Sequence, residues 1–486
     1  MRKERCRSRL RLKLSGAALE LEDLPALQRR ALWEAARYLS RRRARGYLVG
    51  GFLRDYLGGK ISSDIDIAVG GVEPSGVAGH LSKTLGLSRP VVFPRFKTVL
   101  VVGRGIQVET CRMAGDLPGD AVRRDFTVNC LYADLASMHE GCERVGIADP
   151  TASGLADLKA GLLRTPQDAL FTMWLDPLRI LRAVRFHAAG GYRISSDLLE
   201  AMDRMAYLLT RVSQERVRME IERVLVSSRL ESAMRLMLRT GVLAVVMPEV
   251  AQTDGFAQKT PYHAYDLFTH LVKTAAATPP DVVLRLAALL HDVGKISTQM
   301  AKPDRMVYYG HEKKSAETAA EVMRRLRFPN RSRELASLLV ANHMINYSTA
   351  WSDRAVRRFA TRMGSNLDSI LKLAEADRRA QKPGRSRGRA LMDLSRRILE
   401  SQTVRGLGRA LPLDGRDIMT ILGIGEGPLV GRAKDFLLEE AANRRRPMTR
   451  SDAVRALKEW SVQGGVDVAE RGPAGPCIGV DKPRTS

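Results

Sequence analysis

Residues 47–69 restrict the fold of this chain more than any other stretch, because they join two strand-like runs through a glycine pair. The first run, Tyr47-Leu48-Val49, is apolar and opens onto Gly50-Gly51. The second, over 63–69 (SDIDIAV), alternates polar and apolar side chains, which is typical of a strand with one buried face. A helix is predicted between the two runs. This order of elements indicates a unit that mixes helices with a sheet.

The rest of the chain divides into a short continuation of this unit and a long helical part. A helix is predicted over 24–45, and further strands are predicted at 99–102, 106–110 and 128–135. After Pro166 the pattern is helical almost throughout, with turns at glycines and prolines. The predicted fold class is therefore an α+β head with a small mixed sheet, followed by a predominantly α-helical body.

Two carboxylates in the second strand predict a cation site. Asp64 and Asp66 are two residues apart, so both side chains point to one face of the strand. Acidic groups this close repel each other unless a cation lies between them, and hard oxygen ligands on a rigid element suit Mg²⁺. Gly50 and Gly51 let the backbone approach a triphosphate, and Arg54 adds positive potential at the helix N-terminus. A lone Asp-x-Asp pair is more often a solvated strand edge, so the glycine pair is needed for this interpretation.

The charge of the chain narrows the class of partner. The formal net charge is +25 and the isoelectric point is near 10.3, a surplus that usually serves a polyanion, with nucleic acid as the first candidate. A membrane surface is the rival, but the basic residues are spread along the chain, and no membrane span or signal peptide is expected. The five cysteines form no Cys-x-x-Cys pair, so a reducing compartment, the cytoplasm, is expected.

A second group of residues with metal-binding chemistry follows further along the chain. Five of the eight histidines fall within 263–343, and His291-Asp292 is an adjacent imidazole–carboxylate pair. A lone histidine is usually structural. An ordered set of nitrogen and oxygen ligands suits a divalent transition metal, or Mg²⁺, with open water positions for phosphoester hydrolysis. In chain order the candidate ligands are His270, His291, Asp292, His311, His343 and Asp377.

The pattern Gly-Gly-x-x-Arg-Asp at 50–55, followed by Asp-Ile-Asp at 64–66, resembles the polymerase-β-like nucleotidyltransferases. Within them it is similar to the class II family of CCA-adding enzymes and bacterial poly(A) polymerases. The resemblance implies template-independent addition of C and/or A to the 3′ end of tRNA, from CTP and ATP, with Mg²⁺ and release of pyrophosphate. Four further motifs follow in family order, at 123–129 (RRDFTVN), 149–164, 176–186 (DPLRILRAVRF) and 214–220 (QERVRME).

The same resemblance implies roles for individual residues. Asp176 and Arg179, three apart on a predicted helix, share a face, and together they imitate a complementary base that selects C or A. Glu109 is a third candidate metal carboxylate beside Asp64 and Asp66; the alternative is an ordinary edge glutamate. The implied nucleotide-binding residues are Gly50, Gly51, Arg54, Arg123, Arg124, Asp125, Asn129, Asp176, Arg179, Arg182 and Arg185.

Two features depart from the family pattern. Leu175 stands where the family commonly has a glutamate before the selecting aspartate. The segment 110–122 is shorter than the flexible loop of full CCA-adding relatives, which helps the pocket change from CTP to ATP. A shortened segment is a trait of relatives that stop after two C residues, so partial CC addition is an alternative function. A poly(A) polymerase with the same head is a further alternative.

The histidine-rich region resembles the HD phosphohydrolase superfamily. The usual ligands of that superfamily correspond to His270, His291, Asp292 and Asp377, and His311 and His343 are positioned in sequence to hold a second metal. His263 has no assigned role, and His80, His139 and His187 are interpreted as surface or packing residues. Domains of this type hydrolyse phosphate esters in some relatives and are scaffold in others, and metal binding is the interpretation favoured here.

Two rival classes of protein do not fit the motifs of this chain. Signalling enzymes that combine nucleotidyltransferase and HD parts lack the 123–129 and 176–186 segments, and a non-catalytic RNA-binding protein conflicts with the retained aspartates. Candidate tRNA backbone contacts are Arg385, Arg387, Arg389, Arg444, Arg445, Arg446 and the 423–428 turn.

The chain is predicted to comprise six units. They are a basic arm (1–23), the head (24–150), a neck with the nucleotide-selecting helix (151–250), the HD unit (251–400), a tRNA-contacting helical unit (401–462) and a disordered tail (463–486). The sequence does not fix the oligomeric state.

Overall fold

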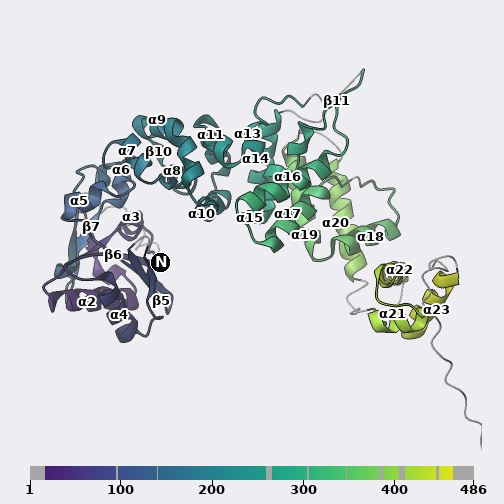
Figure 1. Cartoon of the computed structure of the whole chain (residues 1–486), viewed down its shortest axis with the longest axis horizontal. Coiled ribbons are helices and arrows are strands. Elements are labelled where there is room, and N and C mark those ends of the chain that lie inside the picture. The colour runs from purple at the N-terminus through teal and green to yellow at the C-terminus, as the bar shows by residue number, and fades with distance from the viewer. Residues whose placement is uncertain are drawn as a thin grey trace, which may run out of the picture.

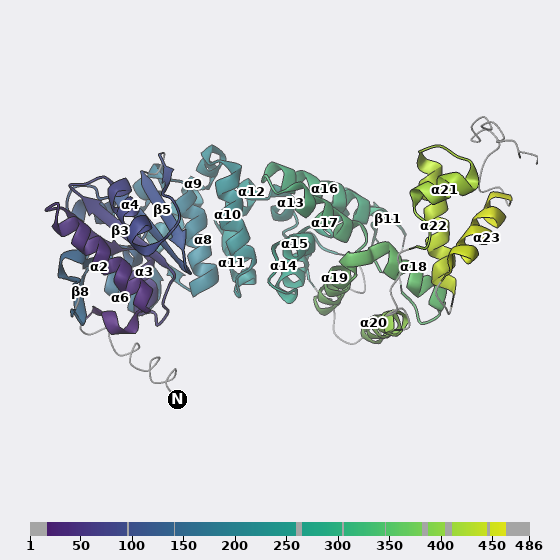
Figure 2. The same cartoon turned by 90° about the horizontal axis from the view of Figure 1, so that it is seen from below.

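The structure is a computed structural model that describes residues 17–94, 97–139, 141–258, 265–303, 306–345, 347–381, 387–403, 411–444 and 448–462. Within these ranges the chain passes from a sheet-containing head through two helical parts to a small C-terminal helical unit (Figures 1 and 2). No helix in them combines the length and the apolar character needed to cross a bilayer. Most of the predicted arm, His263, Arg385, Arg445, Arg446 and the predicted tail lie outside the described residues.

One mixed eight-stranded sheet forms the head, with the strand order β1-β8-β7-β2-β3-β6-β5-β4. The central strands β3 and β6 run parallel, whereas β3 also pairs antiparallel with β2. The predicted mixed sheet is therefore confirmed. The strands are β1 (Ala18–Glu20), β2 (Arg45–Val49), β3 (Asp64–Gly70), β4 (Val91–Phe93), β5 (Thr98–Gly103), β6 (Ile106–Arg112), β7 (Tyr132–Asp134) and β8 (Arg144–Ala148).

The alternation in β3 decides which way its carboxylates point. Ile65, Ile67 and Val69 are fully buried in a core that they share with the helices α2 (Ala26–Ser40) and α4 (Pro74–Leu85). Successive side chains of a strand point to opposite faces, so Asp64 and Asp66 must lie on the other face. The hydrophobic effect on one side of β3 thus holds both carboxylates on the side where the site forms.

Two predicted elements differ from the observed ones. Only Tyr132–Asp134 of the predicted strand 128–135 is extended, because Thr127–Asn129 forms a short 3-10 helix in which the Cys130 N–H donates to the carbonyl of Thr127. The helix predicted over 24–45 ends at Ser40, and β2 begins at Arg45. In β2, a Cβ on Gly46 would lie 2.3 Å from Cδ1 of Leu39, so a larger residue would require the Leu39 side chain on α2 to move.

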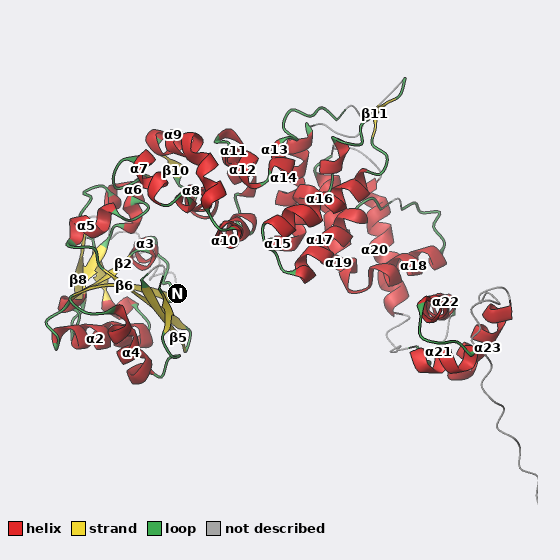
Figure 3. Ribbon diagram, viewed as in Figure 1, coloured by secondary structure: helices red, strands yellow, loops and turns green. Residues whose placement is uncertain are grey.

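Beyond the head the chain is helical, as Figure 3 shows by the concentration of strands at one end. Exceptions are the parallel pair β9 (Leu162–Leu163) and β10 (Arg193–Ile194) and the hairpin β11 (Met300–Ala301) and β12 (Met306–Val307). The neck contains α6 (Gly154–Ala160), α7 (Ala169–Leu175), α8 (Leu178–Gly190), α9 (Ser196–Met205), α10 (Gln214–Leu225), α11 (Leu230–Arg239), α12 (Val242–Val246) and α13 (Pro248–Ala251).

The remaining helices form the HD unit and the C-terminal unit. The HD helices are α14 (Leu267–Ala277), α15 (Val282–Leu290), α16 (His311–Arg325), α17 (Asn330–Ala341), α18 (Asp353–Met363), α19 (Leu367–Arg379) and α20 (Arg387–Thr403). The C-terminal helices are α21 (Gly415–Leu422), α22 (Pro428–Asn443) and α23 (Arg450–Trp460), which enclose a small apolar core of their own.

The neck and the HD unit share one continuous apolar core. The buried guanidinium of Arg285 on α15 donates to the carbonyls of Leu225, the last residue of α10, and of Ser227, with an Nη1–O distance of 2.7 Å to Ser227. Arg325 on α16 forms a bidentate ion pair with Glu249 of α13, with N–O distances of 2.6 and 2.8 Å. These contacts fix the two helical parts against each other, and the boundary near residue 250 stays a sequence-based prediction.

Candidate active site and metal centre

Three carboxylates meet on the open face of the central strands of the head. Asp66 of β3 is the register partner of Glu109 on β6, and Asp64 lies opposite Gln107. Because neighbouring strands point paired residues to the same face, Glu109 joins Asp64 and Asp66. Asp64 is exposed, whereas Asp66 and Glu109 are half-buried. The structure therefore brings together all three carboxylates that the sequence singled out.

The electrostatics of this cluster favour a bound cation. Burial and the charges of Glu109 and Asp64 raise the pKa of Asp66 to about 6, although Arg124 and the backbone N–H of Gly51 oppose them. Three carboxylates on rigid strands are a hard oxygen donor set of the kind that Mg²⁺ prefers. A divalent cation would remove the repulsion that raises this pKa. The residues present therefore fit Mg²⁺.

Gly50 allows the backbone to pass directly beside the cluster. Its φ is +69°, and a Cβ built on it would lie 3.1 Å from Oδ2 of Asp66 and 3.6 Å from Nη1 of Arg124. A side chain at this position would be strained, and it would crowd Oδ2 of Asp66. The next residue, Gly51, begins α3 (Gly51–Leu57), which carries Arg54 as predicted.

Two arginines beside the carboxylates are held by one buried aspartate. Oδ1 of Asp120 accepts from Nε of Arg123 at 2.7 Å, and its Oδ2 accepts from Nη2 of Arg124 at 2.8 Å. Asp120 lies on α5 (Leu117–Val122), is fully buried, and also accepts from the Tyr132 hydroxyl at 2.8 Å. Burial raises its pKa, but Arg124, the Ala114 N–H and Arg123 outweigh burial and hold the pKa below its usual value. Asp120 was not predicted from the sequence; its spacing of three and four residues from the two arginines was the available signal.

A second buried carboxylate orients groups on three elements. Oδ1 of Asp125 accepts from Nδ2 of Asn129 at 2.8 Å, and its Oδ2 accepts from Nε of Arg182 on α8 at 2.8 Å. Asn129 in turn accepts from Nη1 of Arg54 at 2.6 Å. Burial opposes the charge on Asp125, yet Arg182 and Asn129 hold its pKa far below the usual value. Asp125, itself predicted to bind the nucleotide, is buried and orients two other predicted nucleotide-binding side chains, Asn129 and Arg182.

The helix predicted through Asp176 and Arg179 begins only after Asp176. α7 ends at Leu175, and Asp176 is extended, with φ −146° and ψ 97°, before α8 begins at Leu178. The cause is Pro177, whose ring disfavours a helical conformation at the preceding residue. Asp176 therefore stands at a junction, and it does not share a helix face with Arg179.

The partners of this pair were only partly foreseen. Oδ2 of Asp176 accepts from Nη2 of Arg216 on α10 at 3.1 Å. Arg179 donates from Nη1 to the carbonyl of Thr172 at 3.4 Å and from Nη2 to the carbonyl of Arg123. The 214–220 motif was recognised in the sequence, but none of its residues was predicted to belong to the site. The structure connects that motif to Asp176 through Arg216.

Arg185, the last predicted nucleotide contact, is paired within the neck. Its Nε lies 2.7 Å from Oε2 of the buried Glu220 on α10. This ion pair ties α8 to α10. Glu220 also belongs to the 214–220 motif. That motif therefore supplies partners to Asp176 and Arg185, near the two ends of the 176–186 motif.

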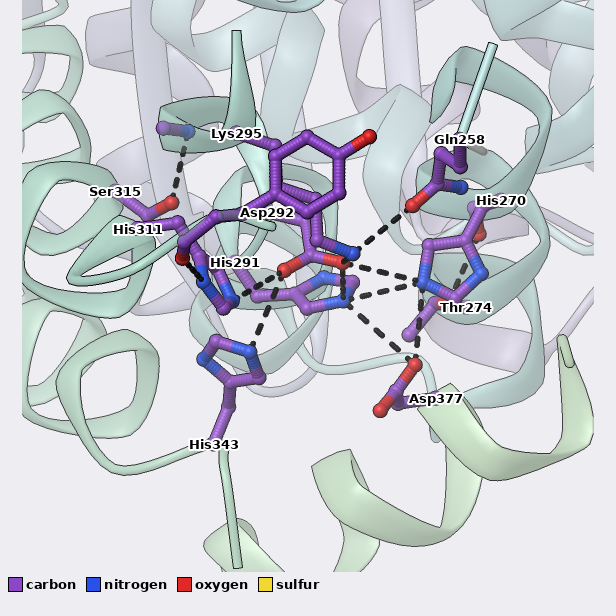
Figure 4. A network of polar contacts seen from close by, with 12 residues as sticks. Gln258, His270, Thr274, His291, Asp292, Lys295, His311, Ser315, His343 and Asp377 are labelled. Atoms are coloured by element: carbon purple, nitrogen blue, oxygen red, sulfur yellow. Dashed lines mark hydrogen bonds and ion pairs between the residues drawn. The ribbon is translucent and has the colours of Figure 1, made fainter. Parts of the chain in front are cut away.

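The six HD candidates converge around one carboxylate, as Figure 4 shows. Oδ2 of Asp292 lies 3.3 Å from Nε2 of His291 and 3.6 Å from Nε2 of His270. Its Oδ1 lies 3.1 Å from Nε2 of His311 and 3.4 Å from Nε2 of His343. Among the described residues, two groups with metal-ligand geometry share Asp292, one with His270 and His291 and one with His311 and His343.

Asp377 completes the first of these two groups. Its Oδ1 lies 3.1 Å from Nε2 of His270 and 3.7 Å from Nε2 of His291. Gln381, one turn later on the chain, donates to both carboxylate oxygens at 3.2 and 3.3 Å. All six predicted HD residues are therefore brought together.

Contacts with backbone carbonyls fix which ring nitrogen of three histidines faces Asp292. Nδ1 of His291, His311 and His343 lies 2.8, 2.7 and 2.7 Å, respectively, from a backbone carbonyl, which turns each Nε2 toward Asp292. This arrangement is usual for histidines that bind metals. Lys295 was missed by the sequence analysis: its Nζ lies 2.5 Å from Oδ2 of Asp292. Despite burial, Asp292 and Asp377 raise the pKa of His291 to about 10, so a metal would have to displace its proton.

The candidate RNA contacts of the C-terminal unit are only partly accessible. The 423–428 turn is largely exposed between α21 and α22. Arg444, in contrast, is held by the buried Asp452, with an Nη1–Oδ1 distance of 2.9 Å. The turn is therefore a more accessible candidate than Arg444.

Three regions of the chain match known protein families. Residues 46–164 match the poly A polymerase head domain, and residues 191–253 match the probable RNA and SrmB-binding site of polymerase A. Residues 262–380 match the HD domain. The three matched regions follow each other in the order that the sequence motifs predicted.

Similar proteins of known name span most of the chain. It is 31% identical to a CC-adding tRNA nucleotidyltransferase of Thermus thermophilus, over 87% of this chain and 95% of that protein. It is also 31% identical to an A-adding tRNA nucleotidyltransferase of Deinococcus radiodurans, over 81% and 91%. The fold resembles a Bacillus stearothermophilus CCA-adding enzyme in complex with CTP, with a TM-score of 0.64 at 23% identity, over 91% and 99% of the two chains.

Proposed function

The chain belongs to the tRNA nucleotidyltransferase family that includes CC-adding and A-adding enzymes, and we propose from this premise that it extends the 3′ end of tRNA with C and/or A without a template. The observation that carries the proposal is the meeting of Asp64, Asp66 and Glu109 on one face of the sheet beside Gly50. The arginines around it and the net charge of +25 suit nucleotide and RNA phosphates.

Each group of residues at the nucleotidyltransferase site, in the head and the neck, has a separate task in this proposal. Asp64, Asp66 and Glu109 hold Mg²⁺, which when bound assists attack by the 3′-hydroxyl and departure of pyrophosphate. Asp176 and Arg179 select the base. Asp125 orients two groups for the nucleotide. The groups that receive the triphosphate and ribose are Gly50, Gly51, Arg54, Arg123, Arg124, Asn129, Arg182 and Arg185.

We further propose that this enzyme adds CC efficiently and the terminal A weakly or not at all. The segment 110–122 is short, and α5 within it is anchored at both ends. Asp116 caps the helix by accepting from the Gly119 N–H at 2.9 Å, and the fully buried Asp120 holds both arginines. A segment held this firmly has little freedom to reorient a pocket between CTP and ATP. Overall identity does not decide the question, because the CC-adding and A-adding relatives are equally similar at 31%.

Supplying tRNAs that end before, within and after the CC sequence with CTP and ATP separately, and sequencing the products, tests this proposal. We expect two C residues to be added, and A to be added to a CC end far more slowly. Efficient A addition to a CC end would contradict the argument from the 110–122 segment but not the family assignment. Long A tails from ATP alone would support a poly(A) polymerase in place of a CC-adding enzyme.

For the HD unit we propose a metal centre that hydrolyses phosphate esters, and the shared carboxylate Asp292 is the observation that favours it. Carboxylate and imidazole ligands arranged as two groups on one bridging residue suit a pair of divalent cations, which together activate water and stabilise a leaving oxygen. The donor set fits transition metals as well as Mg²⁺.

The double variant His291→Ala, Asp292→Ala should lose its transition metal while nucleotide addition continues at the wild-type rate. The reason is that these ligands follow α15 in the HD unit, apart from the head carboxylates. Elemental analysis of the purified protein measures the metal content, and His187→Ala, which removes a histidine of the neck, is the matched control. Metal content equal to that of wild type would contradict the ligand assignment.

A further inference from the structure

Three large apolar side chains stand exposed on α7, directly before the base-selecting pair. Phe171, Trp174 and Leu175 are 46%, 57% and 46% exposed, respectively. The rings of Phe171 and Trp174 are stacked, with centroids 6.0 Å apart and planes inclined by 19°. Their spacing of three and four residues places them on one face of α7, while the opposite face packs on α9. Exposed aromatic groups of this size usually mark a binding surface.

This exposed face is physically joined to the base-selecting groups. Arg179 donates to the carbonyl of Thr172, in the middle of α7, and also to the carbonyl of Arg123. Asp176 follows α7 without an intervening residue. Because α7 has seven residues, and a helix rises about 1.5 Å per residue, the stacked rings lie within one or two nucleotide lengths of Asp176.

The chemistry of the face suits unpaired bases better than a protein partner. Three side chains on one short helix are far fewer than the roughly 20–30 residues per side of a stable protein interface. A stacked ring pair with an exposed outer face can continue its stack with a base, which is how single-stranded RNA is commonly bound. The nearby Arg123, 44% exposed at its side chain, adds positive charge for a phosphate.

We propose that Phe171 and Trp174 form a stacking platform for the unpaired 3′-terminal bases of the tRNA primer. The platform holds the primer end so that its terminal hydroxyl lies beside the incoming nucleotide. This inference rests on the proposed tRNA-extending function. Both aromatic residues are positioning residues, because they act on the primer and not on the reacting atoms. Their loss should therefore change primer binding and leave CTP binding unaltered.

The test compares wild type with the double variant Phe171→Ala, Trp174→Ala and with the conservative variant Trp174→Phe. Tyr207→Ala, which removes another exposed aromatic side chain (58% exposed) in the neck, is the control. The primer is a tRNA acceptor-stem hairpin with 2-aminopurine as its last unpaired base, whose fluorescence falls on stacking. We expect the double variant to raise KM for the primer by about tenfold to a hundredfold, with KM for CTP unchanged. Wild type, Trp174→Phe and Tyr207→Ala should quench the fluorescence, and the double variant should not.

The possible outcomes separate this inference from the function on which it rests. If wild-type protein neither binds nor extends the primer, the proposed function is wrong and the platform with it. If wild type extends the primer and the double variant has the same primer KM and the same quenching, only the platform is wrong. A fall in mass from dimer to monomer in the double variant, measured by light scattering, would show that the face binds a second copy and would also overturn the platform.

Discussion

Replacing Asp66 by alanine is expected to lower the rate of nucleotide addition by at least about 10³-fold, because removing one ligand from a metal site that stabilises a phosphoryl-transfer transition state has an effect of this order. Binding of tRNA should stay near the wild-type level, since the arginines and the candidate RNA contacts of the C-terminal unit are untouched. Single-turnover addition of CTP to a tRNA primer measures the rate, and a filter-binding titration measures the affinity. A variant that adds nucleotides at a rate comparable to wild type would show that the site is misplaced.

Stability provides the control for this experiment. Burial and neighbouring charges raise the pKa of Asp66 from 3.8 to about 6, so without metal its ionised form is less favourable in the folded than in the unfolded protein. Above pH 6 this carboxylate therefore subtracts from stability, and below its unfolded value it does not. Asp66→Asn should then melt in chelator at or above the wild-type temperature at pH 7.5. Asp203→Asn, which removes an exposed carboxylate of α9, should keep full activity.

The same pKa gives the Mg²⁺ requirement a direction with pH. A proton competes with Mg²⁺ for Asp66 below about pH 6, so the Mg²⁺ concentration for half-maximal rate should rise as the pH falls through that value.

Asp66 was identified from the sequence because its signal is local. Alternation over 63–69 predicted the strand, and the glycine pair and the second aspartate stood within the same short stretch. The register that adds Glu109 needed the parallel pairing of β3 with β6.

Contacts between distant segments could not be predicted in the same way. Arg216 reaches Asp176 across 40 residues, and Arg182 reaches Asp125 across 57. No periodic pattern in the sequence records such a pair, because periodicity reflects only the neighbours of each residue along its own segment. The break at Pro177 was in principle visible, since proline restricts the residue before it. It was missed because the motif reads as one continuous helix. The order of the HD ligands was predictable, whereas the buried Lys295 beside Asp292 depends on tertiary packing.

The base-selecting role proposed for Arg179 leads to the second large effect. Arg179→Ala should lower kcat/KM for CTP by about a hundredfold and should also raise the misincorporation of UTP relative to CTP by at least about tenfold. Cytosine presents an amino donor beside a ring-nitrogen acceptor, which an aspartate acceptor and an arginine donor can satisfy together. Uracil presents an acceptor and a ring N–H in those places, so its N–H faces the donor of Arg179. Removing the donor removes this repulsive contact, and with it part of the discrimination.

Arg179→Lys separates charge from geometry. Lysine keeps the positive charge but lacks the planar fork that reaches both the base and the carbonyls of Thr172 and Arg123. It should therefore lose fidelity almost as fully as alanine while retaining more of the rate. Arg204→Ala, at an exposed ion pair on α9, is the matched control and should change neither quantity. Sequencing the products of a reaction with equal concentrations of CTP, UTP, ATP and GTP measures the choice directly. If the ratio of C to U is unchanged while the rate falls, Arg179 only ties α7 to Arg123, and base selection must come from other groups in the pocket.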